Sequence, residues 1–325
     1  MSELLDDVYG LVTVTGGLLT DLLNSRAVQR LERISQAGAS SLVREGRSVT
    51  RYEHSVGVMN LVARLGGSET EQAAGLLQDV SHTAFSHTVD YVFGDRQEEF
   101  HERIFKTVVE RSDIPSILAS HGLTWHQLFA PHNLIRVDVP SPLLCADRID
   151  YTLRDLVRFR HISVTEAQAF VESLEFKDNN VVIVDKEQAW AFVEWYNYLV
   201  SEIFMNPLEL YAHDELARII REGLKLGVLL ESDLLGTDDL LVGKLMSDKN
   251  NRLAKLFKEL KNTQDIIIGE VSEARRVHSK ARVIDPLVAR DGDVVPLSIL
   301  RPEVRLLSTD IRRKAREGIL IKRKE

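Results

Sequence analysis

The chain has 325 residues, of which 44% are hydrophobic and 28% charged, the composition of an ordinary soluble protein with a sizeable core. Its net charge of −8 argues against a nucleic-acid-binding protein, although a small anion could still bind in a local basic pocket. No stretch approaches the roughly 20 apolar residues that span a bilayer, and the acidic start is unlike a signal peptide. The single cysteine, Cys145, excludes an internal disulfide. We therefore expect a cytoplasmic protein with no membrane partner.

The spacing of apolar residues predicts a mostly helical chain. A short β-like run at residues 12–15 precedes two short helices, which we expect between residues 18 and 34 with a break near residues 24 and 25. Ser68 is expected to cap a helix that carries Gln78 and Asp79 near its C-terminal end. The other helices are expected at 52–65, 98–111, 142–159, 165–174, 187–205 and 207–227, and a strand is expected at 179–185.

The sequence changes in character beyond about residue 230, where a helical pattern gives way to β-branched runs separated by turns. The last residues, 312–324, are rich in arginine and lysine, which favours a solvated tail over a docking surface for nucleotide phosphates or RNA. We predict a helical core over 1–228 and a small α+β appendage over 229–325 that ends in this basic tail. Within this appendage we expect a helix at 237–260, and the β-branched runs lie at 266–268, 283–285 and 294–295.

Three residues on different predicted helices have side chains suited to a divalent metal. His54, Asp79 and Asp147 offer an imidazole and two carboxylates, a donor set for Fe, Mn, Co, Ni or Zn with positions left for water and a phosphate oxygen. Arg51 lies three residues before His54, on the same helical face, and could neutralise a phosphate. The same spacing from Asp79 to His82 places an imidazole beside a metal carboxylate.

Several short motifs occur in a fixed order along the chain. They are QRL at 29–31, SQAG at 35–38, TRYEHS at 50–55, DVSH at 79–82, FSH at 85–87 and DRIDY at 147–151. In this order they resemble the HD superfamily of metal-dependent phosphohydrolases, and within it the dNTP triphosphohydrolase branch, over residues 5–225. The resemblance implies an HD-domain helical core, a divalent metal, which could be Mn, Fe, Co, Ni, Mg or Zn, and hydrolysis of a phosphoester or phosphoanhydride in a nucleotide or another phosphorylated small molecule.

The same resemblance implies roles for individual residues. The metal ligands correspond to His54, Gln78, Asp79 and Asp147, and the general-acid cluster corresponds to His82, Asp90 and His101. One face of the helix that carries Asp147 is polar, and this pattern independently predicts that the face lines the site. The residues expected to contact sugar or phosphate are Gln36, Arg51, Arg148, Tyr151, Arg154 and Asp155. The histidines outside the motifs, expected to be structural or exposed, are His121, His126, His132, His161 and His213.

Gln78 stands where the family has a histidine. Its amide oxygen is a weaker donor than imidazole for first-row transition metals, although Mg or Mn tolerates it, so we expect metal affinity and hydrolysis to fall. Three interpretations remain open, namely an engineered ligand knock-out, a naturally inactive member that binds without turnover, and an altered but working metal site. The intact surroundings of Gln78 favour the first of these.

A second departure concerns the substrate. Residues 204–207 read Phe-Met-Asn-Pro, where dNTP-hydrolysing relatives tend to have a Tyr-x-His-Lys word whose lysine meets phosphate. The substrate class could therefore differ from dNTPs. The main prediction is a metal-dependent phosphohydrolase impaired at Gln78, and the alternative is a catalytically inactive nucleotide-binding, nucleotide-sensing or scaffold protein. The resemblance also implies a homo-oligomer.

Overall fold

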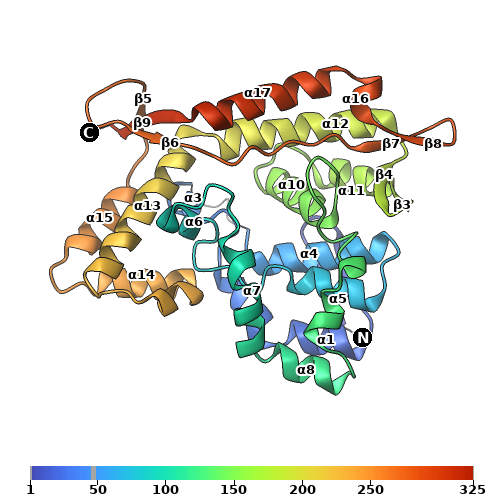
Figure 1. Ribbon diagram of the computed structural model, residues 1–325, viewed down its shortest axis with the longest axis horizontal. Helices are drawn as coiled ribbons and strands as arrows, with labels where there is room; N and C mark the ends of the chain where they lie inside the picture. The colour runs from blue at the N-terminus through green and yellow to red at the C-terminus, as the bar shows by residue number, and fades with distance from the viewer. Residues whose placement is uncertain (1, 45–48, 325) are drawn as a thin grey trace.

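A computed structural model describes residues 2–44 and 49–324. The chain is mainly helical, as the periodicity indicated, and begins with a β-hairpin (Figure 1). Elements up to the middle of the chain are β1 (Ser2–Asp6), β2 (Gly10–Val14), α1 (Gly17–Leu23), α2 (Arg26–Gln29), η1 (Arg30–Arg33), α3 (Ser40–Val43), α4 (Arg51–Arg64), α5 (Glu69–Leu77), α6 (Thr88–Phe93), α7 (Phe100–Arg111), α8 (Ile114–Ser120), α9 (Trp125–Leu128), η2 (Pro131–Asn133) and α10 (Ala146–Arg158).

The second half of the chain contains the longest helix, α13, and most of the strands. Its elements are α11 (Val164–Glu172), β3 (Leu174–Lys177), β4 (Asn180–Ile183), α12 (Lys186–Tyr198), the π-helical η3 (Leu199–Phe204), α13 (Pro207–Lys225), η4 (Glu231–Leu235), α14 (Asp238–Met246), α15 (Arg252–Lys261), β5 (Ile266–Ile268), β6 (Arg275–Val277), β7 (Leu287–Arg290), β8 (Asp293–Pro296), α16 (Leu297–Leu300), α17 (Glu303–Glu317) and β9 (Ile319–Arg323). Among the described residues, no helix is both long enough and apolar enough to cross a membrane.

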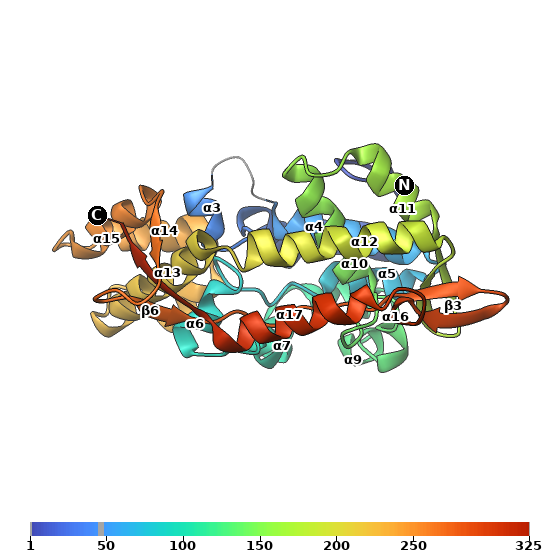
Figure 2. The same cartoon turned by 90° about the horizontal axis from the view of Figure 1, so that it is seen from above.

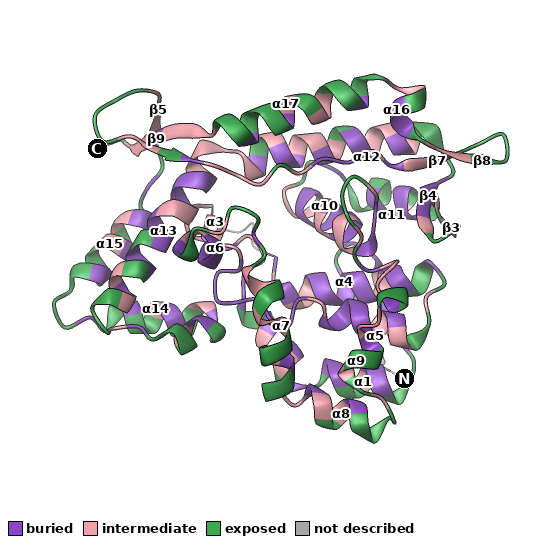
Figure 3. Cartoon of the chain, viewed as in Figure 1, coloured by how far each residue is buried: buried purple, intermediate pink, exposed green. Residues whose placement is uncertain are grey.

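The helices that carry the predicted site have well-defined starts. Thr50 caps α4 and Ser68 caps α5, each in a capping box completed by the glutamate three residues later. α4 and α5 pack against each other, and Gly75 allows the approach because a Cβ at this position would lie 3.3 Å from Val58. Figure 3 shows that α4 is largely buried, whereas α17 exposes much of its surface. The site is therefore built on rigid helices in the interior.

Two clusters of buried apolar side chains form the core, and both draw residues from either side of position 228. Ile284 and Leu297 join Leu153 of α10 in the first cluster. In the second, Phe85 and Val89 pack with residues of α14 and α15. Neither cluster in the described structure is confined to the segment after 228, so that segment shares its core with the helices before it.

Several predictions for the C-terminal part were wrong. The expected basic tail forms α17 and then β9, which is the central strand of the sheet β5-β9-β6. The expected helix at 237–260 is two helices, because Asn251 adopts a left-handed conformation (φ 57°) between them. Residues 283–285 form no strand. The strand predicted at 179–185 is confirmed as β4, which pairs with β3 and, in parallel, with β7 (Figure 1). Figure 2 shows α17 lying along the long axis of the molecule, with α16 and β3 toward one end and β6 toward the other.

Candidate functional site

The four predicted metal ligands lie close together, and His54 Nε2 contacts each of the other three. His54 comes from α4, Gln78 and Asp79 follow directly after α5, and Asp147 lies in the first turn of α10. His54 Nε2 is 3.0 Å from Asp147 Oδ1 and 3.5 Å from Asp79 Oδ2. Gln78 Nε2 is 3.1 Å from Asp147 Oδ1 and 3.4 Å from His54 Nε2.

These separations match the donor set of a metal ion. Two ligands on neighbouring vertices of an octahedron lie about 3 Å apart when the metal–ligand bonds are about 2.1 Å long. Gln78 presents its amide nitrogen, but a half-turn of the amide would bring the oxygen to the same place. The residues present therefore fit a divalent cation held by His54, Asp79 and Asp147, with Gln78 as a weaker fourth donor.

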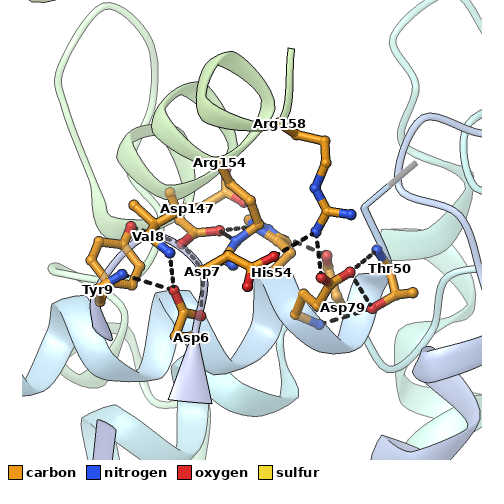
Figure 4. A network of polar contacts seen from close by, with 12 residues as sticks. Asp6, Asp7, Val8, Tyr9, Thr50, His54, Asp79, Asp147, Arg154 and Arg158 are labelled. Carbon is orange, nitrogen blue, oxygen red and sulfur yellow. Dashed lines mark hydrogen bonds and ion pairs between the residues drawn. The ribbon is translucent and has the colours of Figure 1, made fainter. Parts of the chain in front are cut away.

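A hydrogen-bond network behind His54 fixes its orientation (Figure 4). Asp150 Oδ2 lies 2.8 Å from His54 Nδ1, which leaves Nε2 to face the other ligands. Asp150 is itself held by the Tyr9 hydroxyl at 2.8 Å and by two nitrogens of Arg154 at 2.9 and 3.0 Å. Gly57 of α4 allows this contact, because a Cβ there would collide with Asp150 and Arg154.

The electrostatics of the site favour a positive charge between the ligands. Burial alone would lower the pKa of His54, but hydrogen bonds to Asp147 and Asp150 outweigh it and raise the pKa to about 10. Burial opposes ionisation of Asp79, yet the Arg51 guanidinium, 2.6 Å away, helps to hold its pKa well below the usual range. The carboxylates around His54 thus make this position favourable for a cation.

Three histidines form an imidazole cluster (His82, His87 and His101) beside these ligands. The rings of His82 and His101 stack with centroids 4.0 Å apart, and His87 meets both edge-on. His82 Nε2 lies 3.4 Å from Asp79 Oδ1. Burial lowers the pKa of all three rings, so they are neutral near pH 7. Asp90 contacts His87 Nδ1 at 2.9 Å and so reaches the cluster only through that ring.

A pocket of about 550 Å³ opens onto the ligands and the imidazole cluster. Burial raises the pKa of Asp155 in its wall to about 7, so this carboxyl group is partly protonated at neutral pH. The Tyr151 hydroxyl lies 2.9 Å from that of Tyr196. The predicted contact residues that line the pocket are Gln36, Arg51, Arg148, Tyr151 and Asp155.

Arg154 is placed differently from our expectation. It does not line the pocket, and its side chain is 2% exposed. Its guanidinium bonds to Asp150 and, at 2.9 Å, to Asp6 of the N-terminal hairpin. The hairpin covers the part of the polar face of α10 that carries Arg154. This side chain therefore supports His54 through Asp150, on the side of the ring opposite the other predicted ligands. Asp90 likewise lies outside the pocket lining.

Several pocket residues could not be found from sequence words. His213, which we expected to be structural or exposed, lines the pocket on α13 and contacts Thr88 Oγ1 at 2.9 Å. Burial lowers its pKa to about 4, so the ring is neutral. Glu98, Tyr196 and residues 279–283 also line the pocket, and they come from segments without any motif.

Comparisons with known proteins place this architecture. The HD domain family matches residues 51–155. The Bacillus subtilis protein YdhJ is 39% identical over 321 residues, which cover 98% of either chain. The metal-dependent phosphohydrolase cns2 of Cordyceps militaris is 31% identical over 306 residues, which cover 91% of this chain and 88% of the relative. The chain belongs to the HD-domain family of metal-dependent phosphohydrolases. This membership confirms the resemblance and implies a divalent metal.

More distant similarities cover a smaller part of this HD-domain protein or concern the fold alone. A deoxynucleoside triphosphate triphosphohydrolase, SAMHD1 of Danio rerio, is 30% identical over 129 residues, which cover 33% of this chain and 21% of the relative. The crystal structure of a phosphohydrolase from Bacteroides thetaiotaomicron covers the whole of both chains with a TM-score of 0.75 and 20% identity. It therefore shares the overall fold.

Proposed function

We propose that this chain holds a divalent metal between His54, Asp79 and Asp147 and hydrolyses a phosphoester or phosphoanhydride of a nucleotide, with activity lowered by Gln78. The convergence of these ligands at 3.0 to 3.5 Å, next to the imidazole cluster and inside the pocket, carries the proposal. The nucleotide is supported by the similarity to a relative named as a deoxynucleoside triphosphate triphosphohydrolase.

Each group in the pocket has a task in this reaction. When bound, a divalent cation supplies activation of water at neutral pH and stabilisation of charge on phosphoryl oxygens. Asp150 keeps His54 Nε2 free for the cation, and Arg51 lies where it can neutralise a phosphate oxygen. His82 or His101, neutral at rest, takes up the proton that the attacking water loses and passes it to the leaving oxygen, and the Asp79 carboxylate nearby stabilises the protonated ring in between.

The first test restores the missing imidazole. Gln78→His should raise metal affinity by at least about 10- to 100-fold, the change that even an outer-shell partner of a metal ligand typically produces. Elemental analysis of purified protein should then find nearly one ion per chain instead of a fraction. The same variant should release phosphate, pyrophosphate or triphosphate from members of a nucleotide panel in the presence of Mn, Co, Ni or Mg.

The matched control is Gln72→His, the same substitution on α5, the helix that Gln78 directly follows, but outside the pocket lining. It adds an imidazole without completing the ligand set, so metal content and turnover should stay as in the unmodified chain. Equal metal content in all three proteins would show that position 78 does not ligate. Full metal content in Gln78→His without turnover on any nucleotide would exclude the proposed substrate class.

One observation favours a second candidate, a nucleotide-binding protein without turnover. The Gln78 amide donates a hydrogen bond to Asp147 Oδ1, and this bond partly satisfies the carboxylate without a metal. Gln36, Tyr151 and Asp155 line the pocket irrespective of residue 78. A thermal-shift assay and a hydrolysis assay distinguish the two candidates. The binding protein would gain thermal stability from a nucleotide and would hydrolyse none at high metal concentration.

A further inference from the structure

An irregular segment forms one wall of the pocket and comes from the far C-terminal part of the chain. Residues 278–285, here called the strap, join β6 to β7 and bridge the two C-terminal sheets (Figure 1). The Tyr91 hydroxyl donates a hydrogen bond to the His278 carbonyl at 3.2 Å, and the Ser141 hydroxyl donates one to the Val283 carbonyl at 2.7 Å. The strap is therefore tied to the helical core on either side of its pocket-lining residues.

Arg282 anchors the middle of the strap. Its guanidinium forms an ion pair with Glu98 and lies over the Phe204 ring, 5.1 Å from the centroid. Burial would raise the pKa of Glu98, but Arg282 and neighbouring cations lower it, so the pair is ionised at neutral pH. The charge of Arg282 is thus largely neutralised, and this side chain fixes the position of its neighbour Lys280.

Lys280 differs from the other cations of the pocket. Arg44 is paired with Glu209, Arg51 with Asp79 and Arg282 with Glu98. Arg148 donates to main-chain carbonyls of residues 139 and 143. Lys280 lines the same pocket, and within the described parts of the chain its ammonium group has no ion-pair or hydrogen-bond partner. Among the described arginines and lysines of the pocket, it is the one whose charge is not already paired with a carboxylate or bound to main-chain carbonyls.

The surroundings of Lys280 locate it within the pocket. Burial lowers the pKa of His101, and the positive charge of Lys280 adds to this effect. His101 stacks on His82, and His82 contacts Asp79. Lys280 also acts on Glu98 and Glu102 of the pocket wall, but it is not among the main charges acting on His54 or Asp79, which places it on the His101 side of the pocket. An anion that contacts both the metal ligands and Lys280 has to extend across the cluster.

We propose that Lys280 binds a phosphate group other than the one at the metal ligands, so that the pocket selects substrates that carry a chain of two or more phosphates. This inference rests on the proposed function and names its substrate class. A metal and Arg51 serve a single phosphate, whereas each further phosphate adds charge that needs another cation. Lysine is suited to this role, because its ammonium group is a compact charge that binds phosphate without strict geometry.

The test measures binding of inorganic tripolyphosphate to the full-length chain by calorimetry in EDTA, which excludes a metal bridge. Lys280→Gln should weaken binding by about tenfold or more, the loss expected for a hydrogen bond to a charged group. Lys280→Arg keeps the charge and should restore most of the affinity. Lys261→Gln serves as the matched control, because Lys261 is an exposed lysine at the end of α15 outside the pocket.

Three results would overturn the inference: no saturable binding to the unmodified chain, equal affinity in Lys280→Gln, or an equal loss in Lys261→Gln. The melting temperature of each variant shows that it is folded. The outcome is separable from the proposed function, because the measurement needs neither metal nor turnover. Failure of Gln78→His to hydrolyse any nucleotide would reject the activity and leave tripolyphosphate binding as measured. Turnover by Gln78→His with unchanged tripolyphosphate binding in Lys280→Gln would reject the role of Lys280 alone.

Discussion

Arg154→Ala is expected to lower the free energy of unfolding by about 3–5 kcal/mol, the cost of breaking a buried ion pair by removing one partner. Arg154 is 2% exposed and joins Asp150 on α10 to Asp6 of the N-terminal hairpin. Without it, two buried carboxylates lose their cation while remaining out of reach of water. Denaturant unfolding monitored by circular dichroism measures the change directly.

The control for this prediction lies one turn further along the same helix. Arg158 also pairs with two carboxylates, Asp7 and Glu53, but its side chain is 28% exposed. Ion pairs open to solvent contribute little, so Arg158→Ala should cost only about 0–1 kcal/mol. Similar losses in the two variants would show that the buried network does not stabilise the fold as described. A loss of metal in Arg154→Ala within the Gln78→His background would further tie the network to the position of His54.

The contrast between Arg154 and Asp147 shows what sequence could and could not decide. Both lie on the polar face of α10, and the sequence marks that face without saying what covers each part of it. In the structure, one side of α10 lines the pocket through Asp147, Tyr151 and Asp155. The adjacent side, with Asp150 and Arg154, lies against the β1–β2 hairpin through Tyr9 and Asp6. The polar stripe therefore predicted that Asp147 lies at the pocket, whereas Arg154 does not line the pocket where we expected it to contact substrate.

Short sequence motifs located residues that the structure brings close together, because these residues lie at the start and end of helices. His54 sits in the first turn of α4, and Gln78 and Asp79 follow the end of α5, positions that a cap and a short motif reveal. Lys280 and Arg282 have no such signal. They reach the pocket through long-range packing of β9, which holds β6 by pairing and was expected to be a solvated tail.

The imidazole cluster should account for most of the remaining catalytic effect once the ligand set is complete. In the Gln78→His background, His82→Ala or His101→Ala should lower turnover by about 10²- to 10⁴-fold, the usual contribution of a positioned proton donor. The side chains that contact His54 Nε2 are those of Gln78, Asp79 and Asp147, and neither His82 nor His101 is among them. The metal content of both variants should therefore change little. The measurement pairs phosphate release with elemental analysis of the same samples.

His161→Ala provides the matched control, because this histidine stacks on Tyr198 outside the pocket lining. Its removal should leave turnover and metal content unchanged. Loss of metal together with activity in His82→Ala would move His82 into the coordination sphere, which its 3.4 Å contact with Asp79 makes the most direct alternative. Unchanged turnover in both His82→Ala and His101→Ala would remove the cluster from proton transfer. His101→Ala is then the more informative of the two variants. Within the described residues, no hydrogen bond or ion pair joins His101 to a predicted ligand, and its ring stacks on His82. A loss of activity with full metal content would therefore be attributed to the imidazole cluster.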